Sequence, residues 1–308
     1  MSTVILQNGA AVNAALYTSL TMGPAMWADS YAMTINSNQA SELYAWLGNV
    51  PVMREWIGGR QAKQLREYSW RVDNKDYEAT LEVHLNELRR GSSGSAIMLK
   101  IAQLAQRVQS FPSKMLTQLL TDGEATACYD GQYFFDTDHS EGDSGSQSND
   151  LTFAAATGTT PTVAEFRDAV VASIAAMMSY LDDQGEPANE DAKSFEIMVP
   201  PSLMGTAISA VRLPTLDAGA TNVIPALSEF SITPVINARL TNAAKFYTIR
   251  TDGPMKPFIK QVEQELTVAS IAEGSELEFE EKKHRHGVEW MGAFAYGFWN
   301  KACLTTFT

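Results

Sequence analysis

The chain has 308 residues, 45% of them hydrophobic and 19% charged, which is typical of a folded protein of one large or two ordinary domains. No run approaches the roughly 20 apolar residues needed to cross a bilayer, and the first residues lack the pattern of a secretory signal, so we expect a soluble protein made in a cytoplasm. The net charge of −13 arises in residues 122–191, where 15 acidic residues meet the single Arg167, and this argues against specific nucleic-acid binding by the folded body.

Residues 1–57 contain several aromatic side chains, among them Trp27, Trp46 and Trp56, without sustained periodicity. An aromatic segment with little pattern of its own is typical of a chain that buries its side chains against another surface. We therefore expect an arm that packs on the rest of the subunit or on a neighbouring one.

A β-hairpin is predicted next. Apolar and polar residues alternate over residues 67–72 and again over residues 77–85, with a polar turn at residues 73–76 between them. Because a two-stranded ribbon is marginal alone, this hairpin should need a partner surface.

A long amphipathic helix should follow Ser92 and Ser93, since apolar residues recur at spacings of three and four from Ile97 to Leu119. Pro112 should kink it or split it near Ser110. Gly123 should end it.

The second half predicts mixed helix and strand. A short strand hairpin is expected over residues 128–139 with its turn at Asp130-Gly131, followed by a polar loop to Asp150. The capping box from Thr162 to Glu165 predicts a helix to Leu181. The remaining expected elements are a strand at 195–199, a short helix at 201–211, a loop at 212–229 and strands at 232–236, 246–250, 258–262 and 288–298.

Residues with chemical potential are few. Cys128 and Cys303 are too isolated for a disulfide framework; two buried thiols are the favoured interpretation, with one bridge between them left open. His284 and His286 could share one strand face, but the sequence supplies no third ligand at suitable spacing, so we expect no metal site.

The group Asp136, Asp138 and His139 could be an acid/base cluster, but a turn at the end of a hairpin is the favoured interpretation. No nucleophile elbow, phosphate loop or dinucleotide fingerprint occurs. We therefore expect no catalytic residue and no cofactor. An enzyme assembled from scattered residues remains the minor alternative.

Four stretches of sequence point to a family. They are Glu42-Leu-Tyr-Ala-Trp-Leu-Gly48, then Pro51-Val-Met-Arg-Glu-Trp56 with Gly59-Arg60, then Asn74-Lys75-Asp-Tyr-Glu78, and last Tyr129-Asp-Gly-Gln-Tyr-Phe-Phe-Asp-Thr-Asp-His139. In this order, over about the first 140 residues, the chain resembles the major head subunits of Mu-like tailed phages, which share the Hong Kong 97-type capsid fold. The remainder matches only in the order of its elements.

The resemblance implies an α+β fold with five parts. They are an N-terminal arm (1–57), an extended hairpin loop (58–90), a peripheral domain with a long spine helix (91–155), an axial domain (156–255) and strands that return to the peripheral domain (256–308).

The resemblance also implies a structural function. Such subunits form hexamers and pentamers that close into an icosahedral head around double-stranded DNA, without sequence-specific binding. Scaffold and portal proteins are the expected partners, a decoration protein is a further one, and the expected location is the virion. A net-acidic wall would not adhere to packed DNA.

The expected contacts between subunits combine charged residues of the hairpin with tryptophans of the arm. Charges of both signs on the hairpin should set the register in which it docks on a neighbouring subunit more than they add to affinity. Burial of the aromatic side chains of the arm should supply most of the stability of the shell. These residues are Arg60, Lys63, Arg66, Arg71, Lys75, Glu78, Trp27, Trp46 and Trp56. An encapsulin-like compartment with a protein cargo is the alternative shell, and a soluble α/β enzyme is the alternative outside it.

Overall fold

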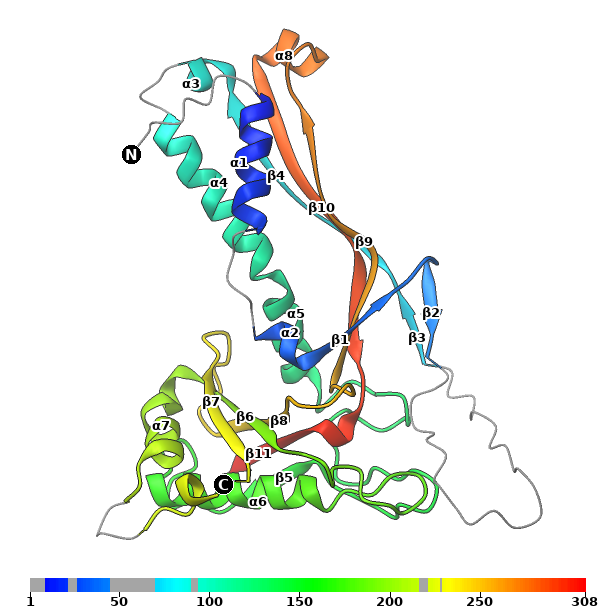
Figure 1. Ribbon diagram of the computed structural model, residues 1–308, viewed down its shortest axis with the longest axis vertical. Coiled ribbons are helices and arrows are strands. Elements are labelled where there is room, and N and C mark those ends of the chain that lie inside the picture. Colours follow the sequence, from blue (N-terminus) through cyan, green and yellow to red (C-terminus); the bar gives the residue numbers. More distant parts are fainter. Residues whose placement is uncertain (1–8, 22–26, 45–69, 90–93, 216–220, 228) are drawn as a thin grey trace, which may run out of the picture.

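In the computed structural model the chain forms a tall column that stands on a broad base (Figure 1). The structure describes residues 9–21, 27–44, 70–89, 94–215, 221–227 and 229–308. Helices and one long sheet build the column, and a second sheet with two helices builds the base. The α+β fold class expected from the sequence is confirmed.

The column sheet has the strand order β1-β9-β10-β4. Its centre is the antiparallel pair β9 and β10, which runs the height of the column and makes the largest element contact in the described fold. β1 pairs parallel with β9, and β4 pairs antiparallel with β10. The strands are β1 (Ala32–Asn36), β4 (Lys75–His84), β9 (Phe258–Ile271) and β10 (Lys283–Tyr296).

The spine lies along this sheet and is split as predicted. Helix α4 (Gly94–Gln109) ends beside Ser110, and helix α5 (Phe111–Asp122) begins with Pro112 in its first turn. Proline is tolerated there because the first backbone N–H groups of a helix have no intrahelical acceptor. The predicted end at Gly123 is confirmed as well.

Helix α1 (Gly9–Thr21) packs along α4 and covers the upper end of the sheet. Its Val12 and Leu16 join Ile97 and Ile101 of α4 and Val288 of β10 in a small core of their own. The short helices α2 (Ala28–Tyr31) and α3 (Leu85–Arg89) lie in the lower and upper parts of the column. The arm is thus folded onto its own subunit over these residues.

The predicted hairpin between residues 67–72 and 77–85 is wrong in its pairing. Strand β3 (Arg71–Asp73) pairs with β2 (Ser41–Leu43), and β4 pairs with β10, so the two neighbouring segments go to different partners. Alternation of apolar and polar residues indicates which side chains of a strand are buried, but it does not identify the strand with which it pairs. Residues 67–69 lie outside the described residues.

The base contains a five-stranded sheet in the order β5-β11-β8-β6-β7. The capping box at Thr162 is formed and starts helix α6 (Val163–Met178). The other elements are β5 (Asp150–Phe153), β6 (Ser194–Val199), η1 (Pro201–Leu203), α7 (Met204–Arg212), η3 (Ile224–Ala226), β7 (Ser231–Ile236), β8 (Lys245–Arg250), η4 (Trp299–Lys301) and β11 (Ala302–Phe307).

Three strand predictions need correction. The strand hairpin expected over residues 128–139 is reduced to one bridge, between Ala127 and Tyr133, around the expected turn, in which Gly131 has φ 90°. No strand forms in this range. β9 and β10 are longer than predicted, and helix α8 (Glu276–Glu281) joins them. The strands β1, β2, β5 and β11 were not predicted.

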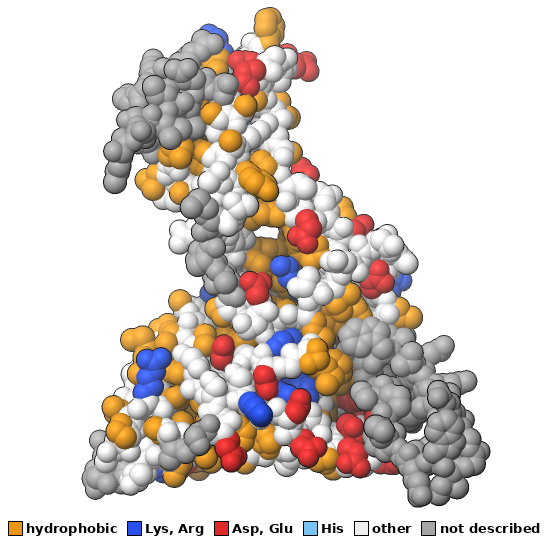
Figure 2. Space-filling model, in the orientation of Figure 1, with side chains coloured by type: hydrophobic (Ala, Val, Ile, Leu, Met, Phe, Trp, Pro, Cys, Tyr) orange, Lys and Arg blue, Asp and Glu red, His pale blue; other side chains and the backbone are white. Residues whose placement is uncertain are grey.

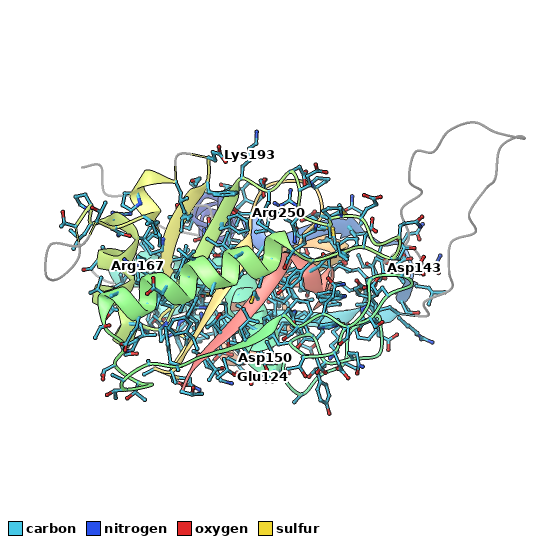
Figure 3. All side chains as sticks on the ribbon, turned by 90° about the horizontal axis from the view of Figure 1, so that it is seen from below. Glu124, Asp143, Asp150, Arg167, Lys193 and Arg250 are labelled. Carbon is cyan, nitrogen blue, oxygen red and sulfur yellow. The ribbon has the colours of Figure 1, made fainter. Side chains whose placement is uncertain are left out.

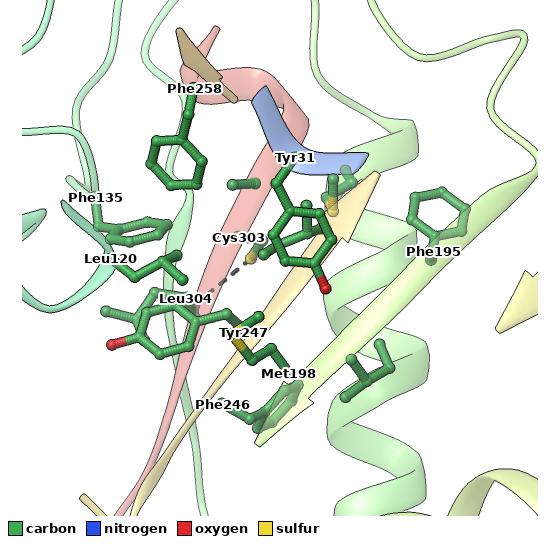
Figure 4. Close-up of a cluster of buried hydrophobic side chains, with 14 of the residues drawn as sticks. Tyr31, Leu120, Phe135, Phe195, Met198, Phe246, Tyr247, Phe258, Cys303 and Leu304 are labelled. Carbon is green, nitrogen blue, oxygen red and sulfur yellow. Dashed lines mark hydrogen bonds between the residues drawn. The ribbon is translucent and has the colours of Figure 1, made fainter. Parts of the chain in front are cut away.

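Aromatic residues dominate the core of the base (Figure 4). Phe134 stacks on Tyr296 at 4.6 Å between ring centroids, and Tyr31 of α2 is fully buried. The Tyr31 hydroxyl donates to Glu196 at 2.5 Å, and burial raises its pKa. The arm is therefore anchored in the base as well as on the column.

Both cysteines are free and buried, which confirms the interpretation as two buried thiols. Among the described helices, none has the length and apolar character needed to span a bilayer.

Because the upper core is small and separate, replacing Ile101 by Ala should destabilise the top of the column by about 2–5 kcal/mol. Hydrogen exchange measured by mass spectrometry should speed up in α1, α4 and β4 and stay unchanged in the base. Leu99→Ala, on the exposed side of α4, is the matched control and should change little. Equal acceleration in the base would contradict the existence of two separate cores.

Candidate assembly surface

The fourth family stretch forms a buried polar cluster in the base, not an exposed turn. His139 is fully buried, and its Nδ1 lies 2.6 Å from Asp130 Oδ2. The Cys128 thiol donates to the other oxygen of Asp130 at 2.9 Å. Burial alone would raise the pKa of Asp130, but hydrogen bonds from His139 and Cys128 outweigh it and hold that pKa below its usual value.

The second ring nitrogen of His139 also donates. Its Nε2 lies 3.1 Å from Asn149 Oδ1, which accepts from the Asp136 backbone N–H as well, while Asn149 Nδ2 faces three carbonyl oxygens. The orientation of the Asn149 amide is therefore fixed, and His139 donates from both nitrogens, as an imidazolium does. The ring stacks on Trp299 at 4.1 Å and 2°, which suits a cation–π contact.

Glu141 completes the cluster from the same loop. Its Oε1 accepts from the Tyr129 hydroxyl and from Trp299 Nε1, both at 2.6 Å. Burial raises the pKa of Glu141. Residues of the loop 128–149 therefore contact Trp299 through the stacked His139 ring and the hydrogen bond to Glu141.

Trp299 lies in the elbow, which we define as residues 297–301, where the chain passes from β10 of the column to β11 of the base. Asn189 holds the elbow from the opposite side, because its Nδ2 donates to Asn300 O at 2.8 Å and its Oδ1 accepts from Lys301 Nζ at 2.9 Å. Burial and, to a smaller extent, the charge of Arg250 lower the pKa of Lys301 to about 8. Two buried polar clusters therefore fix the join between column and base.

The geometry of Cys128, Asp130 and His139 favours hydrogen bonding over metal binding. Their ligand atoms lie within 4.8 Å of one another, but the contacts of 2.9 and 2.6 Å are direct hydrogen bonds. A zinc ion about 2.0–2.3 Å from each ligand would hold them roughly 3.3 Å or more apart. The sequence analysis interpreted Asp136, Asp138 and His139 as a turn and did not predict that His139 is buried. The neighbouring residues in the sequence give no indication of this burial.

A groove with aromatic walls lies between the spine and the column sheet, at the break of the spine helix. Phe111 packs against Tyr77 at 4.8 Å and Phe294 at 6.0 Å, and Trp290 lies 5.5 Å from Tyr77. The cavity of about 310 Å³ is lined mostly by apolar atoms, and Figure 2 shows a hollow at this height with hydrophobic side chains around it. Its size and lining suit an inserted apolar side chain.

Charges of both signs border this groove. Arg107 and Lys260 supply the basic side, and Glu78 and Glu265 the acidic side. Among the described residues, neither Arg107 nor Lys260 takes part in an ion pair. The rim is therefore open to charged groups of a partner.

The structure describes four of the nine contact residues predicted from the sequence. Arg71 is exposed and pairs with Asp73 at 2.8 Å, Lys75 is exposed on β4, and Glu78 lies at the groove. Trp27 is partly buried and packs on Tyr31 at 5.0 Å, within its own subunit. The others, Arg60, Lys63, Arg66, Trp46 and Trp56, lie outside the described residues.

The third family stretch ties the arm to the column sheet. Asn74 Nδ2 donates to Gln39 O at 2.8 Å, and Asn74 Oδ1 accepts from Gln261 Nε2 at 2.7 Å. The Tyr44 hydroxyl donates to Gln261 Oε1 at 2.6 Å, and burial raises the pKa of Tyr44 to about 12. The Tyr44 N–H also donates to Trp70 O at 2.8 Å, so the two residues that flank the undescribed segment are linked to each other and, through Tyr44, to the sheet.

The acidic region of the sequence belongs mostly to the base, seen from below in Figure 3. Arg167 pairs with its neighbour Asp168, and Glu124 pairs with Lys245 of β8. Asp143 and Asp150 come from the loop and strand that border this face.

The two histidines of β10 do share one face, as predicted, and both are fully buried. His286 Nδ1 contacts Asn13 Oδ1 at 2.7 Å, and His284 Nε2 lies 3.4 Å from Glu278. Burial, helped by the neighbouring His284, lowers the pKa of His286 to about 4, although Glu273 opposes this.

Comparison with known proteins connects these features to one family. A family model described as the Mu-like prophage major head subunit gpT matches residues 7–166, and a model of phage capsid protein matches residues 141–306. The chain belongs to the Mu-like major head subunit family.

Curated relatives carry the same description. The chain is 32% identical over 108 residues to the major capsid protein of Escherichia phage Mu. It is 36% identical over 111 residues to the Mu-like prophage FluMu major head subunit of Haemophilus influenzae. These matches cover 35% and 36% of this chain and the same shares of the relatives, so they span about a third of each protein.

Solved structures extend the likeness to nearly the whole fold. A subunit of the bacteriophage JBD30 procapsid has a TM-score of 0.55 at 22% identity, over 96% of this chain and 72% of that one. The mature capsid of bacteriophage PhiM1 has a TM-score of 0.57 at 12% identity, over 93% and 88%. A virus-like particle from Pyrococcus furiosus has a TM-score of 0.50 at 11% identity, over 96% and 97%. At such identities the likeness shows the shared fold.

Removing the carboxylate of Asp130 should strongly destabilise the base, because it leaves the buried His139 ring without its counter-charge. We expect Asp130→Ala to cost about 3–5 kcal/mol of unfolding free energy, measured by urea denaturation. Asp138→Ala removes an exposed carboxylate from the same loop and is the control, with stability close to the parent. Equal stability of the two variants would refute the buried ion pair.

The top of the column should lose stability in acid. Since the folded-state pKa of His286 is about 4 and its ordinary value is about 6.5, folding favours the neutral ring. Stability is then full above about pH 6.5 and declines as pH falls toward 4. Hydrogen exchange of α1 at pH 7 and pH 4.5, corrected for intrinsic rates, should show this loss in the parent and much less of it in His286→Gln. The same pH response in both proteins would exclude His286 as its source.

Proposed function

We propose that this chain is the major structural subunit of a phage or prophage head, assembling as hexamers and pentamers into an icosahedral shell around double-stranded DNA. The observation that carries the proposal is the match of the Mu-like head subunit model to residues 7–166, on a fold that resembles capsid subunits over more than nine tenths of the chain.

The surfaces of the column support this proposal. An aromatic groove with an open, mixed-charge rim suits insertion of a neighbour's side chain, with the charges setting register. A shell subunit needs several modest contacts of this kind rather than one deep pocket. Arg71, Lys75 and Glu78, together with the predicted contact residues outside the described ranges, are proposed to take part.

The proposed domains follow the column and base. We propose that the base corresponds to the axial domain, and the column, with its spine and long sheet, to the peripheral domain. The sequence assigned all of residues 256–308 to strands that return to the peripheral domain; we now propose residues 256–296 for this return, because β11 pairs within the base sheet. The segment at 58–90 is proposed as the extended loop, with the difference that its final part, β4, belongs to the column sheet.

Scaffold and portal proteins are the proposed assembly partners, and the virion is the proposed location. A decoration protein is a further candidate, since the JBD30 capsid was also solved decorated with minor capsid protein trimers. We propose no catalytic role and no cofactor: the residue cluster closest to an enzyme site, around His139, is closed by its own hydrogen bonds.

An encapsulin-like compartment is the other shell to consider, because the archaeal virus-like particle has a similar fold. The fold does not separate the two shells. The family match favours the phage head.

Negative-stain electron microscopy of the purified chain, alone and with its scaffold partner, tests the proposal. We expect closed polyhedral shells, together with a sedimentation coefficient far above that of small oligomers. Asp130→Ala, whose base is destabilised, should yield fewer shells than Asp138→Ala. Uniform small oligomers of the parent under every condition would refute a shell function.

A further inference from the structure

Two buried histidines of the upper column lack the partners that buried polar groups normally have. His284 and His286 lie two residues apart on one face of β10, and both are fully buried. Both ring nitrogens of His284, and Nε2 of His286, have no hydrogen-bond partner among the described residues. An unsatisfied buried polar group costs free energy, so three such nitrogens in one small core indicate a ligand.

Helix α8, at the top of the column (Figure 1), places a carboxylate beside His284. Glu278 Oε2 accepts from Gly274 N at 2.7 Å, which orients the group, and Glu278 Oε1 lies 3.4 Å from His284 Nε2. This separation is longer than an ordinary N–H···O hydrogen bond. A zinc ion about 2.0–2.1 Å from a nitrogen and about 2.0–2.2 Å from an oxygen, at tetrahedral angles, would hold the two atoms about 3.4 Å apart. The pair therefore has the spacing of two metal ligands.

Helix α1 orients His286 as a further ligand. Asn13 Nδ2 donates to Ser270 Oγ at 2.7 Å, so Asn13 Oδ1 is the atom that faces His286 Nδ1, also at 2.7 Å. The pKa of His286, lowered by burial to about 4, makes the ring neutral at pH 7. Its proton is then on Nδ1, which donates to Asn13, and its lone pair is on the unpartnered Nε2. Metal-binding histidines commonly donate their other ring N–H in this way.

The surrounding charges suit a cation. The carboxylate of Glu273 interacts electrostatically with both histidines, and it is held in place by the backbone N–H of Gly9 in α1. The Glu278 side chain is 21% exposed, so an ion can enter past it. A mixed set of imidazole and carboxylate ligands is typical of zinc, whereas calcium and magnesium take oxygen ligands.

We propose that His284 Nε2, Glu278 Oε1 and His286 Nε2 bind a structural zinc ion, with water in the fourth position. The ring centroids of the two histidines are 6.3 Å apart, whereas two imidazoles on one zinc ion have centroids about 5 Å apart. Binding therefore moves the rings about 1 Å closer and turns their Nε2 atoms toward the ion. The sequence analysis expected no metal site because it found no third ligand by spacing; the fold supplies Glu278.

The ion would connect three elements of the upper column. It joins α8 to β10 directly and, through the hydrogen bond between His286 and Asn13, joins both to α1. Such a link stabilises a region that otherwise has only a small core. It takes no part in a reaction.

Titration of the metal-free full-length chain with Zn²⁺, by calorimetry, tests the site, and it does not require assembly. We expect one ion per chain. Glu278→Gln keeps an oxygen for Gly274 N–H but loses the charge, so it should weaken binding at least tenfold. Glu276→Gln changes an exposed glutamate of the same helix and is the matched control, with binding like the parent. A parent that binds no Zn²⁺ would overturn the proposal.

Substitution of the histidines locates the ion on β10. His284→Ala and His286→Gln should each weaken Zn²⁺ binding at least tenfold. His84→Ala should not, because His84 lies opposite Lys283 and so on the other face of the sheet. Unchanged binding in both His284→Ala and Glu278→Gln would overturn the proposal.

The buried cluster of the base is the competing location. Cys128→Ser should bind Zn²⁺ as the parent does. Loss of binding in Cys128→Ser, with binding kept in Glu278→Gln, would assign the ion to the base and would overturn the proposal.

Hydrogen exchange tests the link between elements. With Zn²⁺ bound, exchange in α8 and α1 of the parent should slow severalfold, with no change in the base, and Glu278→Gln should show no such slowing. The acid response expected of His286 concerns the chain freed of metal with a chelator. Equal exchange of α8 and α1 with and without Zn²⁺ in the parent would overturn a structural ion at this place.

Discussion

The join between column and base depends on the burial of polar groups at the elbow. The chain leaves the long sheet through Tyr296 and enters the base sheet at Ala302, and the residues between are held by His139, Glu141, Asn149 and Asn189. An unsatisfied buried polar group is costly, so such clusters tolerate few alternative arrangements. Hydrogen bonds from these side chains therefore hold Trp299, Asn300 and Lys301 of the elbow in place. In the proposed shell every copy would repeat this geometry, and a small error in it would be multiplied around each ring of subunits.

The two hydrophobic cores explain why the surfaces suited to contact lie on the column. The base has a large aromatic core, whereas the upper core rests on few aliphatic side chains and shares its space with two buried imidazoles. Regions with few buried apolar contacts open at lower free energy than the rest of a protein. We therefore expect the column to open locally at lower free energy than the base. Its contact surfaces can then adjust to neighbouring subunits, while the elbow keeps the column and the base in a fixed relative position.

Periodicity in the sequence predicted elements well and partners poorly. The spacing from Ile97 to Leu119, together with Pro112, was sufficient for the split spine, and the Thr162 capping box was sufficient for α6. The same reasoning paired residues 67–72 with 77–85, because a turn sequence lies between them. In the structure β4 pairs instead with β10, about 200 residues later in the chain. Long-range pairing depends on tertiary packing, which a local pattern does not encode. The burial of His139 was not predicted for a related reason. Its partner Trp299 is remote in sequence, and the acidic residues beside His139 have the composition of a turn.

Weak contacts are an advantage for a protein that must build a closed shell. An exposed ion pair contributes roughly 0.2–1 kcal/mol, and one exposed apolar side chain adds about 1.5–3 kcal/mol when it is buried. The groove combines an apolar surface with charges of both signs. A misplaced subunit would lose the charge complementarity and could dissociate, whereas a correctly placed one gains a contact at every neighbour. Charges of both signs around modest apolar surfaces therefore favour selection of the correct arrangement during assembly over tight binding of any single pair.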